Sequence, residues 1–217
     1  MTFGLSPVML TKGRKNPTEI AGMEHANVKD AVALIDFVQR LEKTLKSGEE
    51  EWDELKAAKE LKKKRAEQAD NKGLSFATIS AYGPNGAVIH YKPNNLTNAK
   101  IGRDNLYLLD SGGQYVDGTT DVTRTFHFGV PTEFQRSAYT RVLLGSIDLA
   151  RATFLKGTPD TRLDVLARGH LYQAGLNYRH GTGHGIGAYG FIHESPIQVR
   201  TIRTNYLKSG TSIDRPR

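Results

Sequence analysis

The 217-residue sequence contains no cysteine. This absence excludes disulfides, thiolate metal sites and cysteine nucleophiles, so a bound metal ion must be held by His, Asp and Glu side chains. No apolar run approaches the roughly 20 residues of a membrane-spanning helix, and the first residues lack the apolar block of a signal peptide. We therefore expect a cytoplasmic protein with no membrane segment.

The overall amino-acid composition is typical of a folded domain. Hydrophobic residues make up 38% of the chain and charged residues 24%, as in ordinary soluble globular proteins. A chain of this length can bury roughly two-thirds of its unfolded surface, which suffices for one domain or for two closely packed halves. We expect a single domain over residues 1–217.

The net charge of +7 raises the question of an acidic partner. The densest basic run, Lys62 to Arg65, follows an acidic cluster at 49–54 on one expected helix, so a solvated, salt-bridged helix face explains it. No aromatic residues are interleaved with the run, as nucleic-acid binding would favour. We do not expect a nucleic-acid partner.

Capping residues and periodicity predict two helices at the start of the chain. Asn16 is a capping residue and Pro17 suits the first helical position, so a helix should run from Pro17 to about Leu45. A second, highly charged helix is expected over 51–69, with Trp52 on its apolar edge. The stripe predicted to be buried on the first helix consists of Ile20, Met23, Ala31, Leu34, Ile35, Val38, Leu41 and Leu45.

From Gly73 onwards the pattern changes to short strands. Strands are expected at 74–81, 87–91, 105–111, 114–116 and 119–128, followed by helices at 131–154 and 160–174 and by glycine-rich segments with short apolar pieces. The order of helices, strands, helices and strands indicates an α+β fold and argues against a regular βαβ repeat.

Two carboxylates lie in the best-specified hairpin. Asp110 ends one apolar strand and Asp121 lies in the next. A turn centred on Asp117 and Gly118 puts both carboxylates on one face but places Asp110 opposite Thr125, about 13 Å from Asp121 at about 3.3 Å per residue. A shared metal site therefore requires a bend or bulge at 112–113. Two aspartates that bond to turn amides remain the alternative.

Three of the seven histidines lie within fourteen residues, in His180-Gly-Thr-Gly-His184-Gly-Ile-Gly and in Phe191-Ile-His193-Glu194. Imidazole is a common ligand for divalent transition metals, and glycines on both sides of His184 let the backbone approach a ligand closely. A phosphate-binding loop is the rival interpretation, but no Lys-Ser or Lys-Thr pair follows these glycines. The grouping favours a metal or ligand site.

These segments resemble the catalytic domain of aminopeptidase P, the Xaa-Pro aminopeptidase, in metallopeptidase family M24. The resemblance runs from about residue 6 to 196 and includes the spacings of eleven between Asp110 and Asp121 and of nine between His184 and His193. It implies an α+β fold of the pita-bread type, incomplete at its C-terminal end. It also implies two divalent metal ions, usually Mn²⁺, and release of the N-terminal residue from peptides with proline in second position.

Residue roles follow from the same resemblance. It implies that Asp110, Asp121 and His184 are metal ligands. His90 and His193 resemble the family's catalytic and substrate-binding histidines, and His180 is a further substrate-binding candidate or a support for its loop. By strand alternation Arg124 lies on the face opposite Asp121 and is expected to be structural.

The family pattern contains two further glutamate ligands, one before a Pro-Gly pair and one in a later Arg-x-Glu strand. Near the C-terminus, Asp214 or Arg215 takes the place of the first, depending on the alignment, and both alignments stay open. Three interpretations follow: a piece of an active enzyme, an inactive truncated paralogue, or a metal-free binding module. We also expect a homodimer.

Overall fold

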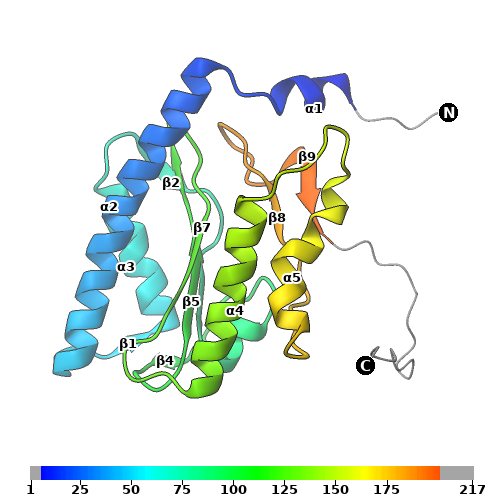
Figure 1. Cartoon of the computed structure of the whole chain (residues 1–217). Coiled ribbons are helices and arrows are strands. Elements are labelled where there is room, and N and C mark those ends of the chain that lie inside the picture. Colours follow the sequence, from blue (N-terminus) through cyan, green and yellow to red (C-terminus); the bar gives the residue numbers. More distant parts are fainter. Residues whose placement is uncertain (1–5, 201–217) are drawn as a thin grey trace, which may run out of the picture.

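The computed structural model describes residues 6–200, apart from the side chains of residues 195 and 197. Strands β5 and β7 run between the pair α2 and α3 and the pair α4 and α5 in the view of Figure 1. The helices are α1 (Pro7–Lys12), α2 (Pro17–Ser47), α3 (Glu54–Ala66), α4 (Glu133–Ala150) and α5 (Asp164–Tyr172), and 3-10 turns span Gly83–Ala87 and Asp160–Arg162. The strands are β1 (Trp52–Asp53), β2 (Asn71–Leu74), β3 (Ile79–Tyr82), β4 (Lys100–Ile101), β5 (Tyr107–Ser111), β6 (Gly113–Tyr115), β7 (Val122–Phe126), β8 (Gly183–Gly185) and β9 (Glu194–Val199). The predicted α+β class is confirmed.

The long first helix is confirmed, with both of its ends specified locally. The Asn16 side chain accepts a hydrogen bond from the backbone N–H of Glu19 at 2.9 Å, and the Glu19 carboxylate accepts one from the backbone N–H of Asn16 at 2.9 Å. This reciprocal cap satisfies two donors that a helix start would otherwise leave unpaired. At the other end Gly48 has φ 74°, a left-handed conformation that glycine adopts without steric cost.

The apolar stripe on α2 differs in part from the predicted one. The buried residues are Ala26, Lys29, Asp30, Ala33, Leu34, Phe37 and Leu41. Leu34 and Leu41 are buried as predicted, but Ile20 and Ile35 are 48% and 68% exposed, and Ala31 is exposed as well. The prediction was wrong for these three because the core-facing stripe passes through Lys29 and Asp30, whose polar side chains a hydrophobicity pattern excludes.

The second helix begins three residues later than predicted. The Asp53 side chain caps it by accepting a hydrogen bond from the Lys56 backbone N–H at 2.7 Å. Trp52 precedes the helix, in the short strand β1, where it pairs with Ile101 of β4. Its indole packs edge-on against Phe37 with ring centroids 5.9 Å apart. Trp52 is therefore a core residue between elements and not part of a helix edge.

Arg65 is the clearest exception to the predicted solvated face of α3. Its guanidinium donates to both carboxylate oxygens of Asp30, at 2.7 and 2.8 Å, and each side chain is 1% exposed. The prediction was wrong for Arg65 because α2 supplies a carboxylate that its planar fork can bind in bidentate fashion. Lys63 and Lys64 do form exposed ion pairs, with Glu60 and Asp36 respectively.

The strand predictions at 74–91 need two corrections. The expected strand at 74–81 is two strands in different sheets, since β2 pairs with β6 and β3 pairs with β5. The expected strand at 87–91 is a 3-10 turn followed by further turns. Buried Glu54 accepts hydrogen bonds from Asn85 Nδ2 at 3.0 Å and from the Tyr91 hydroxyl at 2.7 Å. These contacts fold the segment onto the core.

The later helices are shorter than expected. Thr132 caps α4, which begins at Glu133 and ends at Ala150, whereas the prediction ran from 131 to 154. The expected helix at 160–174 is a 3-10 turn followed by α5. A Cβ on Gly145 of α4 would lie 2.1 Å from the carbonyl oxygen of Ala167, so these two helices pack closely there. No helix among residues 6–200 is long and apolar enough to cross a membrane.

Replacing Arg65 with methionine tests the buried ion pair. Arg65→Met leaves the Asp30 carboxylate buried without its cation, and we expect the free energy of unfolding to fall by about 3–5 kcal/mol. Urea denaturation followed by the fluorescence of the single tryptophan, Trp52, measures this. The exposed neighbour Lys62→Met is the control, with an expected change within about 0.5 kcal/mol. Equal losses in both variants would contradict the assignment.

Candidate metal centre

The hairpin that carries both aspartates has a register two residues away from the predicted one. Asp110 lies opposite Thr123, not Thr125, and the bridge nearer the turn joins Gln114 to Thr119. Tyr115 donates its backbone N–H to the Gly118 carbonyl at 2.8 Å, so the turn is centred on residues 116 and 117.

Contacts with α2 select this turn. Lys29 donates to the Asp117 carboxylate at 2.9 Å, and His25 Nδ1 lies 2.9 Å from the other oxygen of that carboxylate. The Tyr115 hydroxyl donates to buried Asp30 at 3.1 Å. Helix α2 therefore holds the turn through the residue before its centre, Tyr115, and through Asp117. Rules for turns consider only the turn residues themselves, so they cannot predict these contacts.

The new register removes the distance problem. Asp110 and Asp121 are now offset by two residues, so they are diagonal neighbours on one face, a separation of about 7–8 Å between Cα atoms. The prediction was a bend or a bulge at 112–113, and the bulge is wrong because the same register continues through Gly113, whose carbonyl accepts from the Thr120 N–H at 3.0 Å. A Cβ on Gly112 would lie 2.0 Å from the Thr120 carbonyl oxygen, so the close approach of the strands requires glycine there.

A second hairpin brings two histidines together. Strand β8 contains His184, and its residue Gly185 pairs with Glu194 at the start of β9. His193 directly precedes that strand, and the two imidazole rings have centroids 4.0 Å apart. Residues that are nine apart in sequence thereby become neighbours.

The two hairpins meet at Asp121. His184 Nε2 lies 3.4 Å from Asp121 Oδ2, and one ligand atom from each of Asp121, His184 and His193 lies within 4.8 Å of the others. Asp110 lies outside this tight group but close enough for its charge to act on Asp121. A carboxylate and two imidazoles form a donor set that suits a divalent transition metal.

Asp110 shows the electrostatic cost of this arrangement. Its Oδ1 is buried and has no hydrogen-bond partner among the described residues. Burial raises the pKa of Asp110, and burial together with the Asp110 charge raises the pKa of Asp121. Burial and the neighbouring His184 lower the pKa of His193, which favours its neutral form. A bound cation would stabilise both carboxylates, so the residues present fit a metal.

The other residues predicted for the site are less central. His90 is exposed with φ 55°, and its charge reaches both Asp110 and His193, so it lies at the rim of the centre. His180 stacks on Tyr178 with ring centroids 4.6 Å apart, and its carbonyl accepts from Arg168 at 2.8 Å. These contacts fit a support for the loop.

Two further predictions concern Arg124 and the C-terminus. Arg124 is exposed and donates to the neighbouring Thr123 carbonyl at 2.8 Å, away from the carboxylates. Its expected structural role is therefore limited to the surface of β7. Asp214 and Arg215 lie outside the described residues.

A lysine clasp beside His193 was missed by the sequence analysis. Lys15 Nζ lies 2.8 Å from one Glu194 carboxylate oxygen and Lys12 Nζ lies 3.5 Å from the other. Lys12 also sits over the Phe191 ring, 4.7 Å from its centroid. The segment before α2 thereby holds the residue that follows His193. Partners 179 residues apart leave no local signal in the sequence.

An α+β frame that gathers two carboxylates and two imidazoles has the donor set of a divalent-metal centre. Residues 21–213 match metallopeptidase family M24, and the chain belongs to this family. The resemblance inferred from the sequence motifs is confirmed.

Individual relatives agree with this membership. Proteins named "Probable Xaa-Pro aminopeptidase P" from Neurospora crassa and Aspergillus clavatus are 51% and 52% identical over 90% and 94% of the chain. The chain spans 29% and 31% of their lengths.

Solved structures show the fold. An X-prolyl aminopeptidase from Caenorhabditis elegans, described as a cytosolic enzyme with a di-nuclear active site, is 42% identical, with a TM-score of 0.85 over 90% of this chain and 32% of that one. The prolidase from Pyrococcus furiosus is 26% identical, with a TM-score of 0.76 over 94% of this chain and 56% of its own. The chain has part of the pita-bread fold that was predicted.

Neutralising Asp110 tests the fit of a cation. The folded state holds the Asp110 proton more tightly than the unfolded state, so metal-free stability should fall as pH rises from the ordinary carboxyl range through the raised pKa. We expect Asp110→Asn to stabilise the metal-free protein at pH 7 by about 1 kcal/mol and to reduce the rise in melting temperature on adding Mn²⁺. Thermal denaturation at several pH values measures both effects.

Asp36→Asn is the matched control, since the Asp36 side chain is 53% exposed. It should leave the response to Mn²⁺ unchanged. An Asp110→Asn protein that loses stability without metal yet responds fully to Mn²⁺ would contradict a role for Asp110 at the cation.

Proposed function

We propose that the chain carries part of the active centre of an aminopeptidase that releases the N-terminal residue preceding proline. The observation that supports this most strongly is the convergence of two proposed metal ligands, Asp121 and His184, with the catalytic candidate His193 within 4.8 Å, beside the unpartnered buried oxygen of the third proposed ligand, Asp110. The names of the relatives, which are Xaa-Pro aminopeptidases and prolidases, supply the substrate class.

In this proposal Asp110, Asp121 and His184 hold two divalent metal ions, with Mn²⁺ the expected species. When bound, such ions lower the pKa of a water molecule and polarise the scissile carbonyl. The two carboxylates supply negative charge from a partly buried face. Their charge attracts a cation more strongly there than it would in water. His184 completes the set from the second hairpin.

The histidines have separate tasks. The lowered pKa of His193 keeps its ring neutral near pH 7, so one ring nitrogen donates a hydrogen bond and the other accepts. That donor can bind the oxygen on which negative charge develops when the peptide carbonyl is attacked. His90, at the exposed rim, orients the bound peptide, and His180 supports the glycine-rich loop.

Several properties of the whole protein stay predictions. The chain spans under a third of the length of the Neurospora, Aspergillus and Caenorhabditis relatives named above, so activity, substrates and partners belong to the proposal. The cytoplasmic location, the homodimer and a single catalytic domain over residues 1–217 also remain expectations.

Peptide hydrolysis in the presence of Mn²⁺ tests the proposal. The purified protein should release leucine from a Leu-Pro tripeptide, should cleave a Leu-Ala tripeptide far more slowly, and should lose at least about 100-fold in rate in the His184→Ala variant. Chromatography of the products measures all three reactions.

The same samples distinguish the alternative, a metal-free binding module. Stoichiometric Mn²⁺, measured by elemental analysis of protein after gel filtration, supports the metal centre even where turnover is slow. A folded protein that retains no Mn²⁺ and shows no turnover above His184→Ala would contradict the proposed function.

A further inference from the structure

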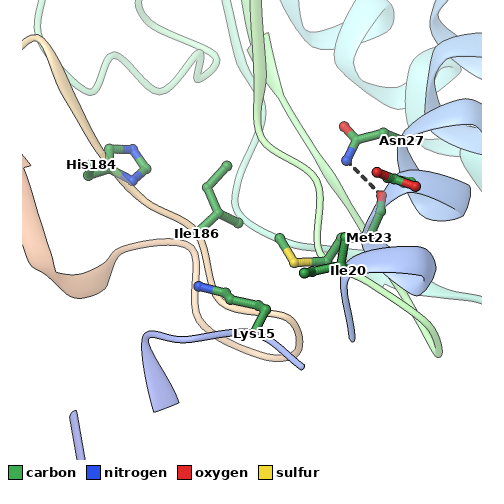
Figure 2. Close-up of a pocket in the computed structure, with 7 residues that line it drawn as sticks. Lys15, Ile20, Met23, Asn27, His184 and Ile186 are labelled. Carbon is green, nitrogen blue, oxygen red and sulfur yellow. Dashed lines mark hydrogen bonds between the residues drawn. The ribbon is translucent and has the colours of Figure 1, made fainter. Parts of the chain in front are cut away.

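An open pocket of about 670 Å³ adjoins the metal centre. It lies between the N-terminal half of α2 and the segment that contains β8, as Figure 2 shows. Its lining consists of Lys15, Ile20, Met23, Glu24, Asn27, His184 and Ile186. Because His184 belongs to this lining and also lies against Asp121, a molecule held at the metal centre can extend into the pocket.

One face of α2 forms the helical wall. Ile20, Met23, Glu24 and Asn27 follow the three- and four-residue spacing of a single helix face. This face is different from the stripe that contains the buried residues of α2. Ile20 is consequently 48% exposed. The fold thus presents to the pocket two apolar side chains that the sequence analysis assigned to the core.

Ile186 continues the apolar surface towards the histidine. In the view of Figure 2 it lies between His184 and the pair formed by Met23 and Ile20. A ligand in contact with all of these side chains would remove apolar surface from water on both walls of the pocket, which favours binding of an apolar group.

The charges of the lining disfavour an anionic ligand. Lys15 is the only cation among the lining residues, and its ammonium group is engaged by Glu194 at 2.8 Å. The Asn27 amide donates to the Met23 carbonyl at 2.8 Å. Glu24 adds a negative charge at the exposed edge. An acidic side chain in the pocket would have to compete with Glu194 for the Lys15 ammonium group. It would also approach the negative charge of Glu24.

We propose that this pocket receives an uncharged apolar side chain of the peptide held at the metal centre, and that Ile20, Met23 and Ile186 determine the specificity for it. The inference rests on the proposed peptidase function and adds the class of side chain that the site accepts. Losing such an apolar contact should lower the affinity about 10-fold, within the range of discrimination by hydrophobic pockets.

The small number of methionines provides a direct probe. The sequence contains three, and of the two within the described residues, Met9 and Met23, only Met23 lines the pocket. Protein labelled with ¹³C at the methionine methyl groups and loaded with diamagnetic Zn²⁺ is titrated with a Phe-Pro analogue whose scissile carbonyl is reduced to methylene. We expect the ring current of the phenyl group to shift the Met23 signal in a saturable way and to leave the Met9 signal unchanged. The matching Asp-Pro analogue should bind at least about 10-fold more weakly.

Variants on one helix separate the pocket from the rest of the site. Met23→Glu and, at a more exposed position, Ile20→Glu should each weaken binding of the Phe-Pro analogue about 10-fold by calorimetry. Both should retain the thermal stabilisation by Zn²⁺, which shows that the fold and the metal centre are intact. The control Val28→Glu lies on the same helix, is 63% exposed and is absent from the lining, so it should bind normally.

The outcomes distinguish the two levels of the proposal. If the Phe-Pro analogue binds while the Met23 signal stays fixed and both glutamate variants bind normally, the pocket assignment is overturned and the proposed function stands. Equal affinity for the Asp-Pro analogue would overturn the apolar preference. If neither analogue binds to Zn²⁺-stabilised protein, this inference falls together with the proposed function.

Discussion

A buried ion pair between Asp30 and Arg65 connects helices α2 and α3 to the strand segment that carries Asp110. Asp30 comes from α2 and Arg65 from α3, and the Arg65 guanidinium also donates to Ser111 Oγ at 3.1 Å, directly after Asp110. The Tyr115 hydroxyl donates to the Asp30 carboxylate from the same arm of the hairpin, directly before the turn. Because a buried charge is costly without its partners, these contacts hold that arm firmly against the two helices. The position of the arm that carries Asp110 thus depends on an interaction outside the site.

The histidine half depends on a different cation. Arg168 of α5 donates to Asp164 at 2.7 Å and to the backbone carbonyls of Tyr178 and His180 at 2.7 and 2.8 Å, so the helix holds the glycine-rich loop that leads to His184. Lys12 and Lys15 bind the Glu194 carboxylate and so hold the first residue of β9, the other strand of this hairpin. In both halves, paired charges hold backbone segments in place, whereas at the metal centre a buried oxygen of Asp110 has no hydrogen-bond partner among the described residues and burial lowers the pKa of His193. That division is what a cation site requires.

Much of the fold was predictable where local chemistry decides it. The start of α2 follows from Asn16 and Glu19 and its end from Gly48, all within a few residues of the helix termini. The segment at 87–91 was mistaken for a strand because it is a short β-type apolar run, whereas buried Glu54, more than thirty residues away, binds and folds it. For the same reason the hairpin register was missed by two residues: local turn rules do not include Lys29, which holds Asp117.

The sequence by itself determined which chemistry was possible. Without cysteine, a metal could be held only by Asp, Glu and His, and the spacings around Asp110, Asp121 and His184 were sufficient to indicate the family. The tertiary structure alone decided that two diagonal aspartates meet a pair of histidines and that Ile20 and Met23 line a pocket. Helix caps and periodicity act over a few residues, whereas pairs such as Asp30 with Tyr115 and Lys15 with Glu194 join residues 85 and 179 positions apart. Such partners are selected by the packing of the whole chain.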